Sequence, residues 1–206
     1  QNDKIQFDYD EIFIKVDEEI QLKSWIIKKD FKKFKTLLIF HGNAGHLSNR
    51  IYKLNELYKL NINILLISWR GFSGNKGSPT ENNLYADAES AIKWLNEKGV
   101  SNNQIILYGE SLGSGVAVEV GKKNNFNSII LESPFTSIEN SAKIYYPYLP
   151  VSLILKDRYA SISKIKIKTN DDFELLSWFH KKNTKYKTIL FLHGNAGNLE
   201  NRIHKI

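Results

Sequence analysis

The stretch "ILYGESLGSGVAVEV" at residues 106 to 120 carries the pattern that decides the fold. It contains G-x-S-x-G, in which the glycines are Gly109 and Gly113 and the serine is Ser111. An apolar run precedes the pattern and small residues able to start a helix follow it, so a tight strand-to-helix turn is predicted at Ser111. Such a turn raises a serine hydroxyl above the sheet as a nucleophile, and the flanking positions must then lack bulk. Three fixed letters also occur by accident, so the prediction depends on the strand before them and the helix after them.

A second stretch, "LLIFHGNAG" at residues 37 to 45, supplies the other part that acyl transfer requires. An oxygen that becomes negative in the transition state needs amide donors aimed at it. The backbone N–H of Asn43, paired with that of Leu112 directly after the serine, is predicted to form this oxyanion hole. His41 is interpreted as a structural histidine that ties down the loop rather than as a catalytic base. His46 is interpreted as a polar residue near a helix start.

Short apolar runs and helical stretches alternate along the chain. The continuous runs, typical of strands covered on both faces, are "TLLIF" (36 to 40), "INILLIS" (62 to 68), "QIILYG" (104 to 109) and "SIILE" (128 to 132). An alternating pattern at 12 to 16 and 20 to 27, around the acidic turn "DEE", predicts a half-buried hairpin. Strands that alternate with helices predict a mainly parallel sheet with helices on both sides, which is a three-layer α/β fold.

Two helices are predicted between these strands. Apolar residues fall at helical spacing in two sets, Leu47, Ile51, Leu54 and Tyr58 in the first and Leu84, Ala88, Ala91, Ile92 and Leu95 in the second. For the second helix, Ser78 is predicted to cap the start, with Pro79 in the first turn and Glu81 completing a capping box. Gly99 is predicted to stop it.

Composition excludes some functions and leaves others open. The 206 residues are 42% hydrophobic, which suits one α/β domain, and the absence of cysteine excludes disulfides and thiol nucleophiles. A net charge of +7 is compatible with nucleic acid, but the lysines are scattered, so a solvated surface is favoured and weak contact with anionic lipid is kept as an alternative. No apolar run has the length of a membrane span, and no signal peptide is visible. The glycine-rich loop "RGFSGNKGSP" at 70 to 79 lacks both phosphate-binding patterns, so a phosphate site is not favoured.

Several motifs together carry a family resemblance over about residues 10 to 165. They are "FHGNAG", "SWRGFSGNKGSPTE", "YGESLGSGVAVEV", "LESPFTSI" and "YYPYLPVSLILKDRYASISKI". In order and spacing they resemble bacterial α/β-hydrolases of the serine-aminopeptidase-like and bud-emergence-like branch. The resemblance implies an eight-stranded, mainly parallel sheet, Ser111 as nucleophile, and the amides of Asn43 and Leu112 as oxyanion hole. It also implies a cap around 145 to 157, a small-molecule ester or amide substrate and no cofactor. Because some members are membrane-associated, both the cytoplasm and a membrane surface stay open as compartments.

The C-terminal part of the chain repeats its N-terminal part. Two segments align: "IKVDEEIQLKSWIIKKDFKKFKTLLIFHGNAGHLSNRIYKL" and, later in the chain, "IKTNDDFELLSWFHKKNTKYKTILFLHGNAGNLENRIHKI". In this alignment His193 corresponds to His41 and Arg202 to Arg50. We therefore predict an α/β-hydrolase core at 1 to 165, lacking its last strands, and a partial second copy of residues 13 to 54 at 166 to 206. The absence of methionine and an end within a helical pattern indicate a piece of something longer, cut from a tandem or joined from two related pieces.

This repeat stands where similar proteins carry the aspartate and histidine of the catalytic triad. The histidines after Ser111 are His180, His193 and His204, and the acids considered there are Asp157, Asp171 and Asp172; none has the sequence context of a triad residue. Glu132, which ends a strand, is the remaining candidate acid, with a polar strand-closing residue as the alternative. The sequence therefore predicts a serine hydrolase with impaired turnover.

A different class of function stays open. In this alternative the chain is a non-catalytic interaction module that forms a homo-oligomer by swapping its second copy, or it is a fragment of a tandem hydrolase. The first six strands would leave an exposed sheet edge beside residues 128 to 132, and the apolar strand at 188 to 192 is predicted to pair there.

Overall fold

The structure, a computed structural model, describes residues 4–43, 45–134, 164–168, 174–178 and 189–192. Its elements run along the chain as follows: β1 (Asp10–Lys15), β2 (Gln21–Ile27), β3 (Thr36–Phe40), the 3-10 helix η1 (Leu47–Arg50), α1 (Ile51–Tyr58), β4 (Asn63–Ile67), α2 (Glu81–Glu97), the 3-10 helix η2 (Asn102–Gln104), β5 (Ile105–Glu110), α3 (Leu112–Lys123), β6 (Ser128–Glu132), β7 (Lys164–Lys168), β8 (Glu174–Trp178) and β9 (Ile189–Leu192). The strands and helices predicted from periodicity are all present, with bounds shifted by two residues or fewer at the strands.

One mixed sheet organises the molecule. Its strand order is β1-β2-β4-β3-β5-β6-β9, seven strands in the described part of the chain, where the resemblance implied eight. β1, β2 and β4 are joined by antiparallel pairing, and every later neighbour is parallel. Parallel strands end at the same edge, so the turns after β3, β5 and β6 meet there.

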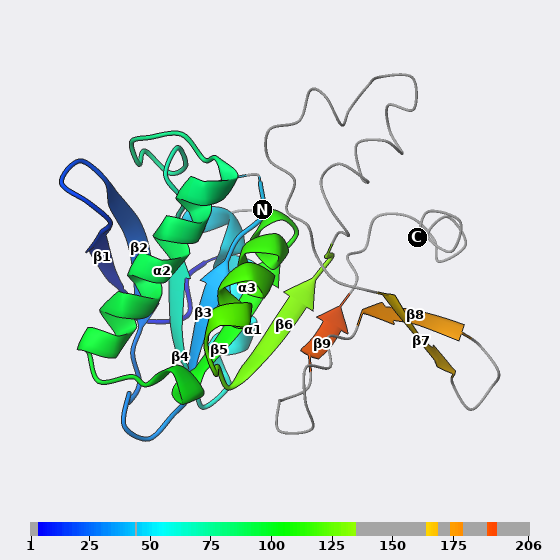
Figure 1. The fold of residues 1–206 in the computed structure, drawn as a ribbon. Coiled ribbons are helices and arrows are strands. Elements are labelled where there is room, and N and C mark those ends of the chain that lie inside the picture. The colour runs from blue at the N-terminus through cyan, green and yellow to red at the C-terminus, as the bar shows by residue number, and fades with distance from the viewer. Residues whose placement is uncertain (1–3, 44, 135–163, 169–173, 179–188, 193–206) are drawn as a thin grey trace.

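Helices cover both faces of this sheet, as Figure 1 shows with α2 and α3 on one side and α1 on the other. Successive side chains of a strand point to opposite faces, and β3 and β4 are buried throughout. Leu38 and Phe40 therefore join the core under α2 and α3, while Leu37 and Ile39 join the core under α1. The continuously apolar runs do mark strands covered on both faces, and the predicted three-layer α/β fold is confirmed.

The start of α2 differs from the prediction. Thr80, not Ser78, is the N-cap, and its side chain accepts a hydrogen bond from the backbone of Asn83. The predicted capping box between Ser78 and Glu81 is therefore wrong. The sequence offers two capping hydroxyls two residues apart, and close packing of Pro79 against Gly71 keeps Ser78 in the preceding loop. The predicted stop is confirmed, because α2 ends at Glu97 and Gly99 has a φ of +84°.

The second copy contributes strands in two places. β9 pairs with β6 in parallel, as the exposed edge predicted, with Ile129 opposite Ile189. β7 and β8 form a separate antiparallel pair with Ile167 opposite Leu175. In the first hairpin the aligned residues, Ile14 and Leu22, are also opposite each other. This shared register supports the prediction of a second copy, which stays a prediction.

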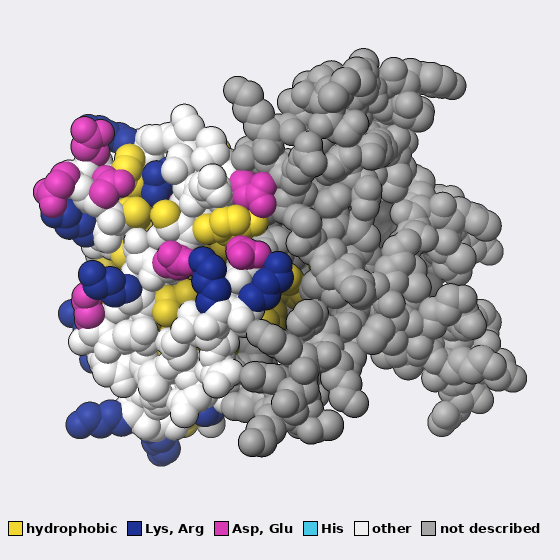
Figure 2. Space-filling model, in the orientation of Figure 1, with side chains coloured by type: hydrophobic (Ala, Val, Ile, Leu, Met, Phe, Trp, Pro, Cys, Tyr) yellow, Lys and Arg dark blue, Asp and Glu magenta, His cyan; other side chains and the backbone are white. Residues whose placement is uncertain are grey.

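The visible face of the described part of the chain carries charges of both signs. Figure 2 shows Lys and Arg side chains lying among Asp and Glu rather than gathered in one patch. Lys122 pairs with Glu119 at 2.8 Å and Lys123 with Glu89 at 2.7 Å. This arrangement agrees with the interpretation of the lysines as a solvated surface. No helix in the described ranges combines the length and the hydropathy of a membrane span.

Candidate active site

Ser111 occupies a single-residue turn between β5 and α3. Its φ of 48° and ψ of −112° lie outside the regions that L-residues normally adopt, and Leu112 begins the helix at once. A backbone in this region costs about 1–3 kcal/mol and persists only where the surroundings enforce it. Ser111 is exposed although its neighbours in α3 are buried. The predicted tight bend is therefore present, and it lifts the side chain out of the sheet.

The glycines around Ser111 stand where backbones approach closely. A Cβ on Gly109 would lie 2.6 Å from the carbonyl oxygen of Gly113, and a Cβ on Gly113 would lie 2.0 Å from the carbonyl oxygen of Phe40. Both distances are far below contact between real Cβ atoms and oxygen. The prediction that these positions must lack bulk is confirmed, and the second contact brings the start of α3 against the end of β3.

The loop after β3 lies directly beside the serine. A Cβ built on Gly42 would be 3.3 Å from the Cβ of Ser111 and 3.4 Å from the carbonyl oxygen of Glu110. Asn43 follows Gly42 on the exposed side of this loop, and Leu112 follows Ser111. The fold therefore brings together the two segments whose amides are the predicted oxyanion donors; the role of those amides stays a prediction.

Hydrogen bonds fix the backbone of Ser111 on both sides. Its N–H donates to the carbonyl oxygen of Glu132 at 2.9 Å, which ties the turn to the end of β6. Its carbonyl oxygen accepts from the backbone N–H of Ser114 at 2.9 Å and from the Ser114 hydroxyl at 2.5 Å. Sequence reasoning missed Ser114, although a small hydroxyl residue three positions into a helix is a recognisable partner for the turn before it.

His41 is a structural histidine, as predicted. Its side chain is buried with 2% of its surface exposed, Nδ1 lies 2.7 Å from the Gly42 carbonyl oxygen, and Nε2 lies 3.3 Å from the backbone nitrogen of Trp69. A backbone N–H only donates and a carbonyl only accepts, so Nδ1 carries the proton and Nε2 accepts. Burial lowers the pKa of His41 to about 4, against a smaller opposing effect of the bond to Gly42. The ring is thus neutral, and its accepting nitrogen, Nε2, is occupied by the backbone N–H of Trp69, which removes it as a general base.

This burial predicts a loss of stability in acid. The unfolded chain takes up a proton near the ordinary pKa of 6.5, whereas the folded chain takes it up only near pH 4. Above pH 6.5 the His41 ring is neutral in both states, so it does not make the free energy of unfolding depend on pH. As the pH drops from 6.5 towards 4, the unfolded chain binds the proton first, and the free energy of unfolding falls by about 3 kcal/mol. Urea unfolding across this range measures the effect. His41→Gln keeps an uncharged acceptor and is expected to show a loss smaller by that amount, while His46→Gln, at an exposed position, should follow the wild type. Parallel profiles for wild type and His41→Gln would contradict the assignment.

A charged cluster missed by sequence reasoning lies beside the turn. Lys53 of α1 donates to Glu110 Oε2 at 2.9 Å and forms a short ion pair with Glu132 Oε2. Arg50 Nη2 lies 3.3 Å from Glu110 Oε1. The Tyr108 hydroxyl donates a short hydrogen bond to Glu132 Oε2. We call these five residues the Lys53 cluster; a sequence signal was lacking because its members come from four separate elements, η1, α1, β5 and β6.

Glu132, the candidate acid, lies at the end of β6 as expected. Its Oε2 accepts from Lys53 and Tyr108, and 28% of its side chain is exposed. A carboxylate held by an ammonium and a phenol resembles a strand-closing ion pair more than an acid that orients a histidine. These contacts favour the polar alternative, and the catalytic role of Glu132 stays a prediction.

Several residues considered as triad members and not favoured, together with the implied cap, lie outside the described residues. They are His180, His193 and His204, the acids Asp157, Asp171 and Asp172, and the cap at 145 to 157.

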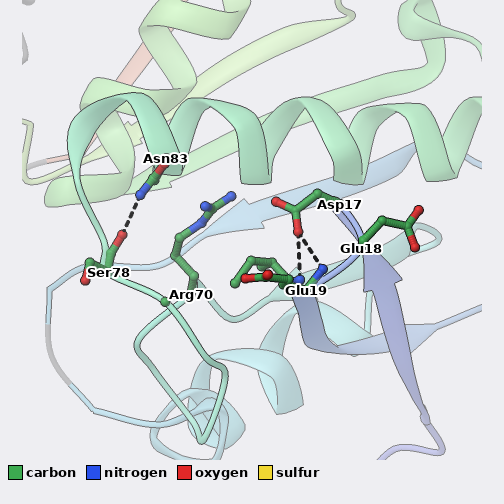
Figure 3. Close-up of a pocket in the computed structure, with 8 residues that line it drawn as sticks. Asp17, Glu18, Glu19, Arg70, Ser78 and Asn83 are labelled. Atoms are coloured by element: carbon green, nitrogen blue, oxygen red, sulfur yellow. Dashed lines mark hydrogen bonds between the residues drawn. The ribbon is translucent and has the colours of Figure 1, made fainter.

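A shallow pocket of about 560 Å³ lies at a different place, next to the turn between β1 and β2 (Figure 3). It is lined by Asp17, Glu18, Glu19, Ile20, Arg70, Gly77, Ser78 and Asn83. Its polar groups serve local structure: Asp17 Oδ1 accepts from the backbone of Glu19 and Ile20, and Asn83 donates to the carbonyl oxygen of Ser78. Because neither Ser111 nor the loop at 42 and 43 lines it, this pocket is not the predicted reaction site.

The fold and the serine turn define an α/β-hydrolase, and comparison with known proteins agrees. The model of the family described as serine aminopeptidase, S33 matches residues 32–196, so the chain belongs to that family.

Two relatives and one solved structure are similar to this chain over 63% to 74% of its length. An uncharacterised Mycobacterium tuberculosis protein, Rv2307c, is 39% identical over 130 residues, which are 63% of this chain and 46% of that protein. Protein bem46 of Schizosaccharomyces pombe is 32% identical over 70% of this chain and 50% of its own length. The crystal structure of an α/β hydrolase from Vibrio vulnificus superposes with a TM-score of 0.61 at 22% identity, covering 74% of this chain and 57% of that one. The chain spans about half the length of the curated relatives it matches.

Proposed function

We propose that this chain attacks the carbonyl carbon of an ester or amide substrate with the hydroxyl of Ser111. The bond from Oγ to the carbonyl carbon forms, the carbonyl oxygen becomes negative, and the backbone amides of Asn43 and Leu112 donate to it. Collapse of this intermediate breaks the ester or amide bond and releases an alcohol or amine, which leaves with the proton that Oγ lost. Water then hydrolyses the acyl group from Oγ and restores the serine. The observation that supports the proposal most is the exposed Ser111 at a φ of 48°, beside Gly42 and between strand and helix. Membership of a hydrolase family supports the reaction class and a small-molecule substrate.

Turnover in this chain is proposed to be impaired. A serine hydroxyl needs a base to take its proton and a group to orient that base. Within the described ranges the histidines are His41, which is neutral and bonded through both ring nitrogens, and His46, which lies exposed in the loop before η1. His41 cannot accept the proton without losing the hydrogen bond from the backbone N–H of Trp69 to its Nε2. Nothing in the described contacts orients His46 towards Ser111. Short p-nitrophenyl esters test this directly, since Ser111-dependent turnover near that of complete hydrolases would refute it.

A fluorophosphonate probe tests the nucleophile without requiring turnover. Its phosphorus forms a bond to Oγ, fluoride leaves and the proton of Oγ passes to the buffer. Prolonged incubation should therefore add one probe per chain to the intact mass, mapped to the peptide containing Ser111. Ser111→Ala should abolish the labelling. Ser90→Ala, which removes a serine hydroxyl bonded to the Ala86 carbonyl oxygen in α2, should leave it unchanged. An unlabelled wild type, or labelling that persists in Ser111→Ala, would overturn the proposal.

The pairing of β9 with β6 favours one alternative. The same backbone donors and acceptors of β6 are available to β9 of another copy, so a homo-oligomer formed by exchange of this strand is the second candidate function. Light scattering separates the two arrangements, because a monomeric mass excludes exchange.

A further inference from the structure

The Lys53 cluster joins the two strand ends that hold Ser111. Glu110 is the last residue of β5 and directly precedes the serine, and Glu132 is the last residue of β6. The two glutamates are opposite each other in the parallel pairing. Like charges directly opposite each other in a sheet repel, so the strand ends need a cation between their carboxylates. Lys53 supplies it, because its ammonium contacts both.

Each glutamate also acts on Ser111 through its backbone. The carbonyl oxygen of Glu132 accepts the N–H of Ser111 at 2.9 Å, and the peptide bond of Glu110 leads into the strained residue. A Cβ built on Gly42 would lie 3.4 Å from Glu110 Oε1, so the same carboxylate also borders the loop before Asn43. One ammonium therefore connects the nucleophile turn, the end of β6 and the edge of the predicted oxyanion loop.

Partial burial makes these contacts stronger than ordinary surface pairs. The side chains of Lys53 and Glu110 are each 24% exposed, and Arg50, on the other Glu110 oxygen, is 9% exposed. Lys53 Nζ also lies 5.1 Å from the centre of the Tyr108 ring. Burial opposes the charge on Lys53, but its hydrogen bonds to Glu132 and Glu110 outweigh this and raise its pKa. At Glu110, burial raises the pKa of the carboxyl group, but the hydrogen bond from Lys53 and its charge outweigh burial, so the pKa of Glu110 is lowered. Lys53 and Glu110 are thus both charged at neutral pH.

We propose that Lys53 is a positioning residue, which holds the strained backbone of Ser111 in place by bridging Glu110 and Glu132. The proposal rests on the proposed function of Ser111 as nucleophile. Without the bridge, repulsion between the carboxylates separates the ends of β5 and β6 and weakens the hydrogen bond from Ser111 to Glu132. The turn then relaxes towards an ordinary conformation, and the hydroxyl leaves the position beside Gly42.

Three lysine variants test the proposal. Lys53→Met removes the ammonium and keeps the aliphatic stem, Lys53→Arg keeps the charge, and Lys59→Met removes an exposed partner of Glu56 just past the end of α1. Two quantities are measured: exchange of the Ser111 amide by NMR, with amides of β4 as reference, and the second-order rate of fluorophosphonate labelling. Lys53→Met is expected to speed Ser111 exchange about tenfold and slow labelling about tenfold, which corresponds to the loss of one charge-assisted contact. Lys53→Arg should restore most of both effects, and Lys59→Met should change neither.

The outcomes separate this proposal from the proposed function. Unchanged Ser111 exchange in Lys53→Met overturns the positioning role whatever the labelling shows. Faster exchange in β4 as well as at Ser111 assigns Lys53 a general structural role and also overturns it. A wild type that is not labelled at Ser111 overturns the nucleophile, while the exchange measurement still decides whether Lys53 holds the turn. If Lys53→Met does not fold, Lys53→Gln, which removes the charge and keeps a polar side chain, is measured in its place. Faster exchange at Ser111 is expected, and unchanged exchange overturns the positioning role.

Discussion

Replacing Gly113 with alanine is expected to cost about 4 kcal/mol or more of unfolding free energy, which is enough to prevent folding of a marginally stable domain. The added Cβ would lie 2.0 Å from the carbonyl oxygen and 2.5 Å from the carbonyl carbon of Phe40. Both are backbone atoms, so rotation of a side chain cannot relieve the overlap. Phe40 is fully buried, and β3 is paired with β4 on one side and β5 on the other. The sheet therefore cannot move away without breaking a ladder of hydrogen bonds.

Gly121 offers a matched control in the same helix. A Cβ there would lie 2.4 Å from Ile129 Cδ1, the flexible end of a side chain that can rotate. Alanine in a helix interior is also favoured over glycine by about 1 kcal/mol, which offsets part of the repacking. Gly121→Ala is thus expected to stay within about 1 kcal/mol of the wild type. Urea unfolding followed by circular dichroism compares the two variants, and equal stability of Gly113→Ala and Gly121→Ala would show that α3 does not approach β3 this closely.

The sequence predicted the need for a small residue at 113 but not the atom that imposes it. G-x-S-x-G is a local pattern, and the contact is made by Phe40 on a strand far upstream. The same division holds for the fold. Continuous apolar runs predicted β3 to β6 because the signal lies within each strand, and an unpaired edge predicted the place of β9.

Features that depend on distant partners could not be predicted. From the sequence, Lys53 is predicted to be an ordinary surface lysine of an amphipathic helix. Its carboxylate partners, Glu110 and Glu132, lie 57 and 79 residues further along the chain. Only the parallel pairing of β5 with β6 brings Glu110 and Glu132 together at one edge. The prediction of the α2 N-cap was wrong for a related reason. Ser78 and Thr80 both fit the capping rule, and packing of the preceding loop leaves Thr80 as the N-cap.

Asp87→Ala is expected to cost about 3–5 kcal/mol, because it leaves a buried guanidinium without its partner. Asp87 is fully buried and the Arg70 side chain is 8% exposed. One carboxylate oxygen accepts from Arg70 Nε at 2.8 Å and Nη2 at 2.6 Å, and the other accepts from the Arg70 backbone at 3.0 Å. The loss therefore frees three donors and releases the loop after β4 from α2. Glu89→Ala on the same helix removes a pair with Lys123 that is about half exposed, and it should cost less than about 1 kcal/mol.

A double variant separates two origins of this cost, the penalty of an unpaired buried guanidinium and the loss of the attraction between Arg70 and Asp87. If the penalty comes from the charge left behind, removing that charge as well should recover stability. The double variant Arg70→Met with Asp87→Leu fills similar volume with apolar atoms and leaves one unpaired donor, the backbone N–H of residue 70. It is therefore expected to be more stable than Asp87→Ala alone, by about 2 kcal/mol in urea unfolding. A double variant no more stable than Asp87→Ala would mean that the carboxylate stabilises the loop chiefly through that backbone hydrogen bond, because this bond is the contact that both variants lack.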